Sequence, residues 1–412
     1  MNLIRNKNFN SIIIIGLINN IGDSLFFIVT MWYVANNSNV SIYAGLAVFL
    51  FTLPETLLIF IGPLIDRVNP KKILMLSTCG QIIIHTILIV LFLGDIVNIP
   101  VLLILLLFSA ICSSITYPVE ETILPQIVEG KDLVKANSVF TVAYKLSNSL
   151  FDGVAGILLV VGSASLIYQI NLVIFILPLF LIRLIKYNLQ TEEFEKFNFS
   201  VYSQELKEGL SFILNSNIKI MLIPLALLNF FTSINLVALP FFSNSLSESA
   251  STYGFLLASS GVGSMLGAVI VNKIEKYVLP GKILTFGLFF NGVLWILMTI
   301  SKVDYLAFFF MFLASLCLGG YNIIFTSLFQ AMTPIKLLGR VNTSIDSVIT
   351  LAMPIGALVG GIIIDIFPLK LVMLLYALAL IVTGFIYFKN NNILTLGKIE
   401  TIQASNDNEF TQ

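Results

Sequence analysis

Twelve long apolar segments, separated by short polar breaks, constrain the fold of this chain more than any other feature of its sequence. Each has about 20 residues, the length that an α-helix needs to cross the ~30 Å hydrocarbon core of a bilayer. Apolar residues fill the segments continuously and do not alternate with polar ones, so we expect helices and not barrel strands. The predicted spans are residues 12–34, 44–65, 73–92, 101–119, 139–161, 166–185, 218–242, 253–274, 283–300, 306–328, 343–366 and 369–388.

The composition is that of a membrane protein. Of the 412 residues, 58% are hydrophobic and 11% are charged, whereas a soluble chain carries about 25% charged residues. The formal net charge is zero, so we expect no nucleic-acid partner. Cys79, Cys112 and Cys317 fall inside apolar segments without disulfide or metal-ligand spacing, and we expect small buried side chains there and no metal or cofactor.

Basic residues predict which side of the membrane each break faces. If both termini are cytoplasmic, 19 of the 22 Lys and Arg residues lie on the cytoplasmic side, because only Lys302, Lys370 and the intramembrane Lys145 are excepted. Short loops rich in Lys and Arg remain in the cytoplasm. We therefore expect a multi-pass protein of the cell membrane with both termini inside. The first segment is too long for a signal peptide.

A polar gap after the sixth span divides the chain into two halves. The expected parts are an N-terminal six-helix half at 1–187, a cytoplasmic linker with an amphipathic helix at 188–217, a C-terminal six-helix half at 218–389 and a polar, disordered cytoplasmic tail at 390–412. Leu206, Leu210, Ile213 and Leu214 give the linker one apolar side, which fits a helix at the inner membrane surface or a plain connecting helix.

The two halves look like repeats. Ala136-Asn137-Ser138 aligns with Val341-Asn342-Thr343 at an offset of 205 residues. A ladder with steps of four, three and four recurs in the fourth and tenth spans, formed by Ser109, Ser113, Thr116 and Glu120 and by Ser315, Gly319, Asn322 and Thr326. The sequence thus predicts an all-α membrane protein with twelve transmembrane helices in two pseudo-symmetric six-helix halves.

A charged turn joins the second and third spans: Gly62-Pro-Leu-Ile-Asp66-Arg67-Val-Asn-Pro-Lys71-Lys72. Its spacing resembles the loop between spans 2 and 3 of major facilitator superfamily transporters, which usually have Gly at position 69. Asn69 can replace that Gly because Asn tolerates a left-handed backbone. The resemblance covers essentially the whole chain and implies alternating access by rocking of the two halves.

Further local features resemble the macrolide-efflux-like drug exporters of that superfamily. They are Asn8-Phe9, Gly22-Asp23, Pro54-Glu55, Leu124-Pro125 with Leu133 and Ala136-Asn137, and Gly339-Arg340-Val341. The resemblance to this branch implies export of drug-like compounds, but it does not fix the cargo.

The charged turn suggests a latch on the cytoplasmic side. Asp66 is placed to accept from the free amides at the start of span 11, around Arg340. The cations Arg67, Lys71 and Lys72, together with Gly62 of the turn, complete the predicted latch, and acids available to pair with them are Glu120, Glu121 and Asp132. The plain alternative is that the cations only anchor the topology.

Ionisable residues inside spans are costly, and three are candidates for proton coupling. Asp23 lies near the middle of span 1, which lines the central cavity in the family fold; the alternative is a buried carboxylate hydrogen-bonded to Asn or Ser for packing. Glu55 follows Pro54, and the proline is expected to bend span 2. We expect Glu55 either to hold and release a proton during transport or to be a structural acid paired to a neighbour. Asp152 lies in span 5, too far from Lys145 to pair with it.

Other polar and aromatic residues are expected around the cargo. The cavity candidates are Asn19, Phe26, Thr30, Tyr117, Asn229, Phe230, Ser233, Asn322 and Phe325. Aromatic and amide groups around an acid suit a bulky amphipathic or cationic compound, although any single Phe can equally be lipid-facing. We expect His85 to be a polar tether and Asp346 to stabilise a helix N-terminus.

Three functions remain. No Walker loop, zinc-ligand set or dinucleotide fingerprint is present, so we expect no enzyme and an ion gradient as the energy source. The first function is a proton-coupled exporter of hydrophobic or amphipathic compounds such as macrolide-type drugs. The second is a dedicated exporter or importer of one metabolite, such as a siderophore or peptide. The third is a non-transporting sensor or scaffold. The intramembrane acids and the complete latch motif disfavour a protein that does not transport. A dedicated polar cargo would require more intramembrane cations than Lys145 alone, which favours the first function. The expected partners are a small-molecule substrate, protons and the lipid bilayer. We expect the protein to be a monomer.

Overall fold

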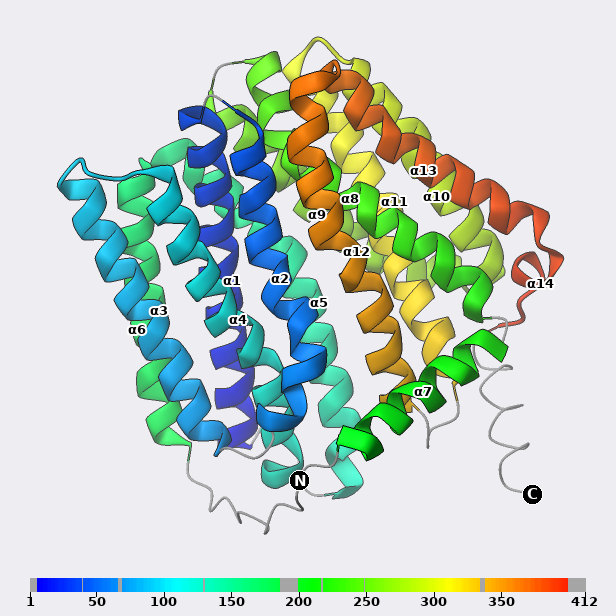
Figure 1. The fold of residues 1–412 in the computed structure, drawn as a ribbon. Coiled ribbons are helices and arrows are strands. Elements are labelled where there is room, and N and C mark those ends of the chain that lie inside the picture. Colours follow the sequence, from blue (N-terminus) through cyan, green and yellow to red (C-terminus); the bar gives the residue numbers. More distant parts are fainter. Residues whose placement is uncertain are drawn as a thin grey trace. The chain divides into compact units, whose positions relative to one another are not determined.

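The computed structural model describes residues 6–38, 40–65, 69–128, 130–185, 199–215, 218–247, 249–333 and 338–398. Within these ranges the regular structure is α-helical (Figure 1). The helices are α1 (Lys7–Asn37), α2 (Ile42–Ile65), α3 (Pro70–Leu93), α4 (Ile99–Ile127), α5 (Gly130–Val161), α6 (Ala164–Leu184), α7 (Phe199–Asn215), α8 (Ile218–Leu246), α9 (Ala250–Ile274), α10 (Pro280–Ile300), α11 (Asp304–Met332), α12 (Leu338–Ile366), α13 (Leu369–Lys389) and α14 (Asn391–Leu394).

Twelve of these helices are the membrane spans. Ten of them are long and apolar enough to cross a bilayer over their described residues, and α2 and α5 contribute the shorter apolar stretches Ile42–Leu58 and Leu150–Val160. The all-helical fold with twelve spans confirms the sequence prediction. The remaining two described helices, α7 and α14, are the ones that do not span.

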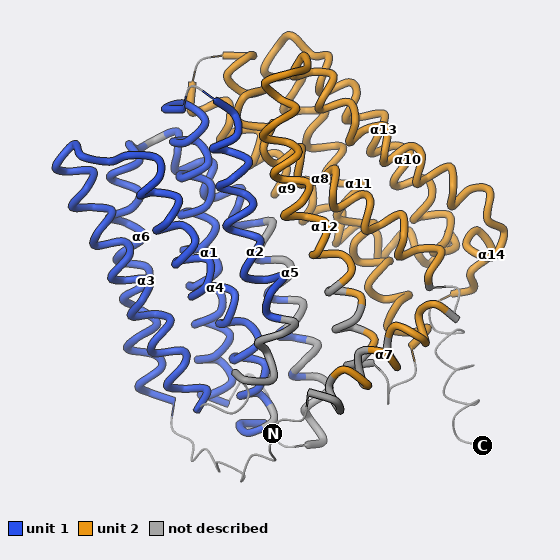
Figure 2. The backbone as a smooth tube through the Cα atoms, viewed as in Figure 1, with its two compact units in different colours: residues 1–197 blue, residues 198–412 orange. Residues whose placement is uncertain are grey.

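The chain forms two compact units, Met1–Phe197 and Asn198–Gln412 (Figure 2). Within each unit the same helix pairs pack together: α1–α5, α1–α6, α2–α4, α3–α4 and α3–α6 in unit 1, and α8–α12, α8–α13, α9–α11, α10–α11 and α10–α13 in unit 2. Equivalent helices α4 and α11 both have 29 residues. They begin 205 residues apart, within one residue of the 206-residue offset between the two polar ladders of the sequence.

Asparagine side chains start several helices of unit 1. The Asn6 side chain accepts from the amides of Asn8 and Phe9 at the start of α1, and Asn98 accepts from Val101 at the start of α4. Asn69 has φ −52° and accepts from the amides of Lys71 and Lys72. It is therefore an N-cap for α3, because its oxygen satisfies orphan amides of the first turn. The expectation of a left-handed residue at this position is wrong.

The two helices that do not span, α7 and α14, belong to unit 2 and pack on its spans. Ile213 of α7 is buried in an apolar cluster with Phe329 of α11 and Val341 of α12. The four-residue helix α14 contacts α10 and α13, and its Ile393 is buried. Residues 391–394 thus form a helix that packs on α10 and α13, which differs from the expectation of disorder from residue 390. Residues 399–412 lie outside the described residues.

Candidate functional site

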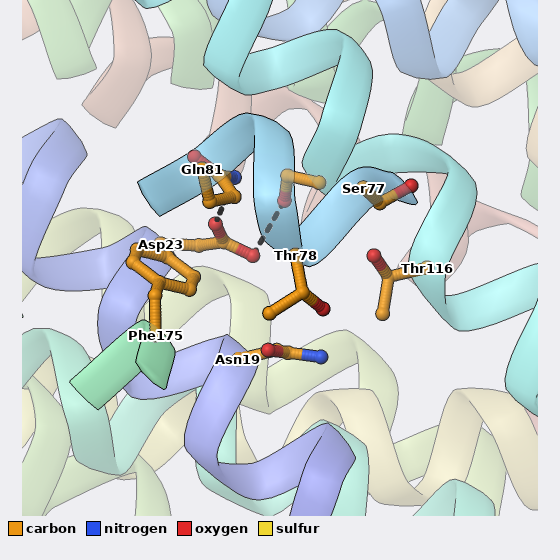
Figure 3. A pocket seen from close by; sticks show the side chains of 8 residues that line it. Asn19, Asp23, Ser77, Thr78, Gln81, Thr116 and Phe175 are labelled. Carbon is orange, nitrogen blue, oxygen red and sulfur yellow. Dashed lines mark hydrogen bonds between the residues drawn. The ribbon is translucent and has the colours of Figure 1, made fainter. Parts of the chain in front are cut away.

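A polar site inside unit 1 is built around the carboxyl group of Asp23 on α1. Gln81 Nε2 on α3 donates to Asp23 Oδ1 at 3.1 Å, and Ser113 Oγ on α4 lies 2.5 Å from Asp23 Oδ2. Both carboxyl oxygens are therefore held by side chains of two neighbouring helices. Figure 3 shows these two contacts as dashed lines. The residues that line the pocket are Asn19, Asp23, Ser77, Thr78, Gln81, Ser113, Thr116 and Phe175.

Gln81 is fixed in one orientation. Its Nε2 atom also donates to the carbonyl oxygen of Ser109 at 3.1 Å, and its Oε1 atom accepts from Ser109 Oγ at 2.7 Å. Both N–H groups and the amide oxygen are thus engaged, which sets the amide orientation. Gln81 always presents an N–H group to Asp23, and it can only donate there.

Ser113 is the adaptable partner of Asp23. A hydroxyl group can donate or accept, because its hydrogen rotates about the C–O bond. Ser113 can therefore donate to an ionised Asp23 or accept from a protonated one without any movement of heavy atoms. This geometry agrees with the structural alternative, a carboxyl hydrogen-bonded to Ser for packing, and it also suits a group that gains and loses a proton.

A second polar network joins α1, α3 and α6 beside this site. The carbonyl oxygen of Gln81 lies 2.8 Å from His85 Nδ1, and His85 Nε2 lies 2.9 Å from Asn171 Nδ2. Asn171 Nδ2 also donates to the carbonyl oxygen of Gly22 at 2.8 Å. His85 is completely buried. It is therefore tied directly to α6 and, through Asn171, to α1, which agrees with the sequence interpretation of a polar tether.

Gly22 allows α6 to approach α1 next to Asp23. A Cβ atom at this position would lie 2.6 Å from Phe175 Cζ and 3.0 Å from Asn171 Oδ1. Glycine is therefore the residue that leaves room for both side chains. The Phe175 ring lies with its centroid 4.9 Å from that of His85 and lines the Asp23 pocket, so close helix packing positions the polar site.

The other two proton-coupling candidates are in different surroundings. Asp152 on α5 is half-buried and close enough to interact with Ser24 on α1. Glu55 on α2 is exposed. Neither residue lines the Asp23 pocket.

Two of the cavity candidates on α1 are packed inside unit 1. Phe26 is 1% exposed, and its ring centroid lies 4.9 Å from that of His85 and 5.9 Å from that of Tyr168. Thr30 Oγ1 lies 3.0 Å from Tyr168 Oη and is fully buried. At these positions the face expected to meet the cargo packs against α3 and α6 instead. Asn19 is also buried, in the Asp23 pocket.

The remaining cavity candidates are mixed in exposure. Tyr117 is half-buried, and its ring centroid lies 4.2 Å from that of Tyr144. In unit 2, Ser233 is buried, Asn322 is exposed, and three candidates are half-buried: Asn229, Phe230 and Phe325. Phe325 stacks on Tyr321 and Phe329 along α11.

Only part of the predicted latch lies among the described side chains. Lys71 Nζ donates to the carbonyl oxygen of Ile185 at 2.9 Å, so it stabilises the C-terminal end of α6. Lys72 is exposed. Asp66 and Arg67 lie outside the described residues. The surroundings of Gly62 and the side chain of Arg340 are also outside the part of the chain that the structure describes.

Glu120 on α4 is a site residue that the sequence interpretation did not include among the intramembrane acids. It was expected as one of three acids available to pair with the latch cations, but it is 0% exposed. Its position after Ser109, Ser113 and Thr116 in the α4 ladder was the available signal. A ladder of this kind marks one face of a helix, and here that face turns toward α1.

Comparison with known proteins identifies relatives over nearly the full length. Residues 2–411 match the family described as transmembrane secretion effector of the MFS class. Two proteins of Bacillus subtilis (strain 168), each named an uncharacterized MFS-type transporter, are similar: YfiS is 26% identical over 389 residues, covering 90% of this chain and 89% of YfiS. YkuC is 21% identical over 382 residues, covering 89% and 87%.

Solved structures share the fold at low identity. The nucleoside transporter NupG has a TM-score of 0.69 at 12% identity, covering 95% of this chain and 100% of NupG. A bacterial homologue of the iron transporter ferroportin, in an inward-facing state, has a TM-score of 0.71 at 17% identity, covering 94% and 99%. These similarities support the twelve-helix fold and carry no information on the substrate.

Proposed function

Because this chain belongs to the transmembrane secretion effector family of the major facilitator superfamily, we propose that it exports hydrophobic or amphipathic compounds, such as macrolide-type drugs, in exchange for protons. A secondary transporter of this superfamily uses an ion gradient as its energy source. The observation that carries the proton proposal is the Asp23 carboxyl group, which is held by one fixed donor, Gln81, and one adaptable partner, Ser113.

Proton exchange at Asp23 fits the energetics of its surroundings. An ionised carboxylate inside a membrane span is costly unless donors satisfy it. Gln81 and Ser113 supply two donors, so the charged form is tolerated, and Ser113 accommodates the neutral form by rotation of its hydroxyl group. A group with two accessible protonation states can load a proton on one side of the membrane and release it on the other. Asp152 and Glu55 remain further candidates.

The export direction and the cargo class rest on separate arguments. The family description speaks of secretion, which favours outward transport. The half-buried aromatic rings of Tyr117, Phe230 and Phe325 suit an apolar or cationic compound. The distribution of cations favours a protein of the cell membrane with cytoplasmic termini. We propose alternating access, with Gly62, Asp66, Arg67, Lys72 and Arg340 in the cytoplasmic latch.

A dedicated metabolite transporter is the second candidate. The structural relatives include a nucleoside transporter and a homologue of an iron transporter, so the fold accommodates polar cargo. The two candidates differ in what they carry and not in the proton site.

Proton flux in sealed vesicles tests the proposal. Inside-out vesicles are loaded with an acidic interior, and a macrolide or a lipophilic dye is added while a pH-sensitive fluorophore reports the interior. We expect the compound to dissipate the gradient with the wild-type protein and not with Asp23→Asn. Asp95→Asn is the matched control, because Asp95 is an exposed turn residue with φ 56°, a conformation that Asn tolerates.

Each outcome is informative. A wild-type response that persists in Asp23→Asn would remove Asp23 from the proton path. No response to macrolides and dyes, with a response to a polar metabolite, would favour the second candidate.

A further inference from the structure

Unit 1 contains a fully buried acid besides the half-buried Asp23, namely Glu120 on α4. The side chain is 0% exposed, and neither carboxyl oxygen has a hydrogen-bond partner among the described residues. An isolated carboxylate without donors is much more costly to bury than a neutral carboxylic acid. The environment of Glu120 therefore favours a bound proton, in contrast to Asp23, which has two donors.

The carboxyl group of Glu120 rests against the backbone of α1. A Cβ atom at Gly16 would lie 2.6 Å from Glu120 Oε2, so the absence of a side chain there makes room for the acid. Asn19, one turn further along α1, comes near the carboxyl group but makes no hydrogen bond of normal geometry with it. The close approach places the acid next to the same helix that carries Asp23.

An apolar cluster of unit 1 includes the residues on either side of Glu120 along α4. It includes Val119, Ile123 and Leu124 of α4 and Ile12 and Ile15 of α1, and all five are at most 1% exposed. By the cation distribution the cluster lies at the cytoplasmic end of the spans. Because this cluster is apolar, the polar side chains that continue from Glu120 along the α1–α4 interface are Asn19 and Thr116, in the direction of Asp23.

The spacing along both helices places the two acids at a useful separation. Gly16 and Asp23 are seven residues apart on α1, and Ser113 and Glu120 are seven residues apart on α4. Since Ser113 meets Asp23 and Glu120 meets Gly16, the two helices run in opposite directions and the acids are about 10 Å apart, at 1.5 Å per residue. Asn19 and Thr116, which line the Asp23 pocket, occupy the intervening turns.

We propose that Glu120 is a second proton-binding carboxyl of unit 1 and that it shares one negative charge with Asp23 along the α1–α4 interface. In the exchange, the O–H bond of Glu120 breaks and an O–H bond of Asp23 forms, while the negative charge moves to Glu120. Asn19, Thr116 and water that enters the polar pocket bridge the two groups. This inference rests on the proposed proton coupling.

The other charged and titratable groups around Glu120 do not supply a counter-ion. Asp23 of α1 is near enough to interact with it electrostatically. Tyr144 of α5 is near enough to feel the charges of both acids and of Glu55 on α2, and it also neighbours Tyr117 of α4. On α3, Lys71 is bonded to the carbonyl oxygen of Ile185. The side chain of Lys145 on α5 lies outside the described residues, and no described cation is paired with Glu120.

Infrared spectroscopy of the purified protein in liposomes tests the inference without any cargo. A protonated carboxyl group has a C=O stretch that ionised groups lack and that shifts slightly in deuterated water. At neutral pH we expect Glu120→Gln to remove one such band. Glu121→Gln, at an exposed neighbouring position on α4, is the matched control and should leave the spectrum unchanged.

A second variant keeps the acid in place. Gly16→Ala pushes a methyl group against Glu120 Oε2, and we expect the band to shift in frequency and not to disappear. If Glu120→Gln does not fold, this shift alone decides: an unshifted band in Gly16→Ala would overturn the inference.

The results separate this inference from the proposed function. Loss of the band in Glu120→Gln, with no proton flux for any compound, would support the proton site and contradict the exporter. An unchanged band in Glu120→Gln, with compound-driven proton flux that Asp23→Asn abolishes, would overturn the inference and leave the exporter intact.

Discussion

His85 Nε2 on α3 lies 2.9 Å from Asn171 Nδ2 on α6, and this contact assigns the protonation of the ring. Gln81 O can only accept, so His85 Nδ1 carries the hydrogen. Gly22 O likewise requires the Asn171 amide nitrogen to face it. The same nitrogen then donates to His85 Nε2, which must be the bare nitrogen of a neutral ring. The single histidine is thus a fixed acceptor inside the bundle.

Removing the Asn171 amide should therefore destabilise unit 1. Asn171→Leu leaves two buried acceptors, His85 Nε2 and Gly22 O, without their donor, and we expect a loss of about 1–3 kcal/mol in unfolding free energy. Thermal unfolding in detergent measures it. Gln169→Leu changes an exposed amide on the same helix and should leave the Tm unchanged. Equal Tm values for both variants would contradict the assignment.

Gly22→Ala tests the close contact of α1 with α6. The added methyl group would lie 2.6 Å from Phe175 Cζ, and overpacking of this kind lowers the unfolding free energy by about 1–3 kcal/mol. Gly287→Ala on α10 is the control, since its Cβ would meet nothing closer than Cys317 O at 3.9 Å. We expect a lower Tm for the first variant and an unchanged or higher Tm for the second.

Ser113→Ala tests the adaptable partner of Asp23. The variant removes the hydroxyl group that contacts Asp23 Oδ2, and we expect compound-driven proton flux to slow about tenfold, equivalent to the ~1.4 kcal/mol scale of one such hydrogen bond. Ser114→Ala removes a hydroxyl that donates to the carbonyl oxygen of Ile111 in its own helix, and its flux should match the wild type. A normal rate in Ser113→Ala would show that the carboxyl works without this partner.

Lys71→Met separates helix capping from the latch. Lys71 Nζ donates to Ile185 O at the end of α6, so its loss should lower the unfolding free energy by about 1 kcal/mol. Lys72→Met, at an exposed position, should be neutral for stability. Transport per folded molecule should stay normal in Lys71→Met if the residue acts only on α6. A stable but slow variant would instead return Lys71 to the latch.

The sequence was sufficient for the fold because apolar length and short breaks determine helical spans in a bilayer. It was less informative at span ends. The predicted fourth span stopped at residue 119, where the apolar run meets Glu120, whereas α4 continues to Ile127. Tertiary packing against Gly16 buries Glu120, and no local hydropathy signal reports such a partner on another helix.

Periodicity located the polar face of α1 but not all of its neighbours. The steps from Asn19 to Asp23, Phe26 and Thr30 place these residues on one side of the helix. That side was expected to meet cargo, yet Phe26 and Thr30 contact His85 and Tyr168 of the same unit. Which helix covers a given face depends on the bundle arrangement, and the spacing within one helix does not contain that information.

Because α4 and α11 have equal lengths, their residues can be compared position by position, and the comparison shows which half carries an ionisable group. In the aligned ladders the carboxylic acid at position 120 corresponds to Thr326, a neutral hydroxyl. After duplication one copy has an acidic inner lining at this level and the other does not. A charge that moves at this level during transport is therefore carried by the first half alone. A chimera built from two first halves would have two ionisable carboxyl groups at this level, where the natural chain has one.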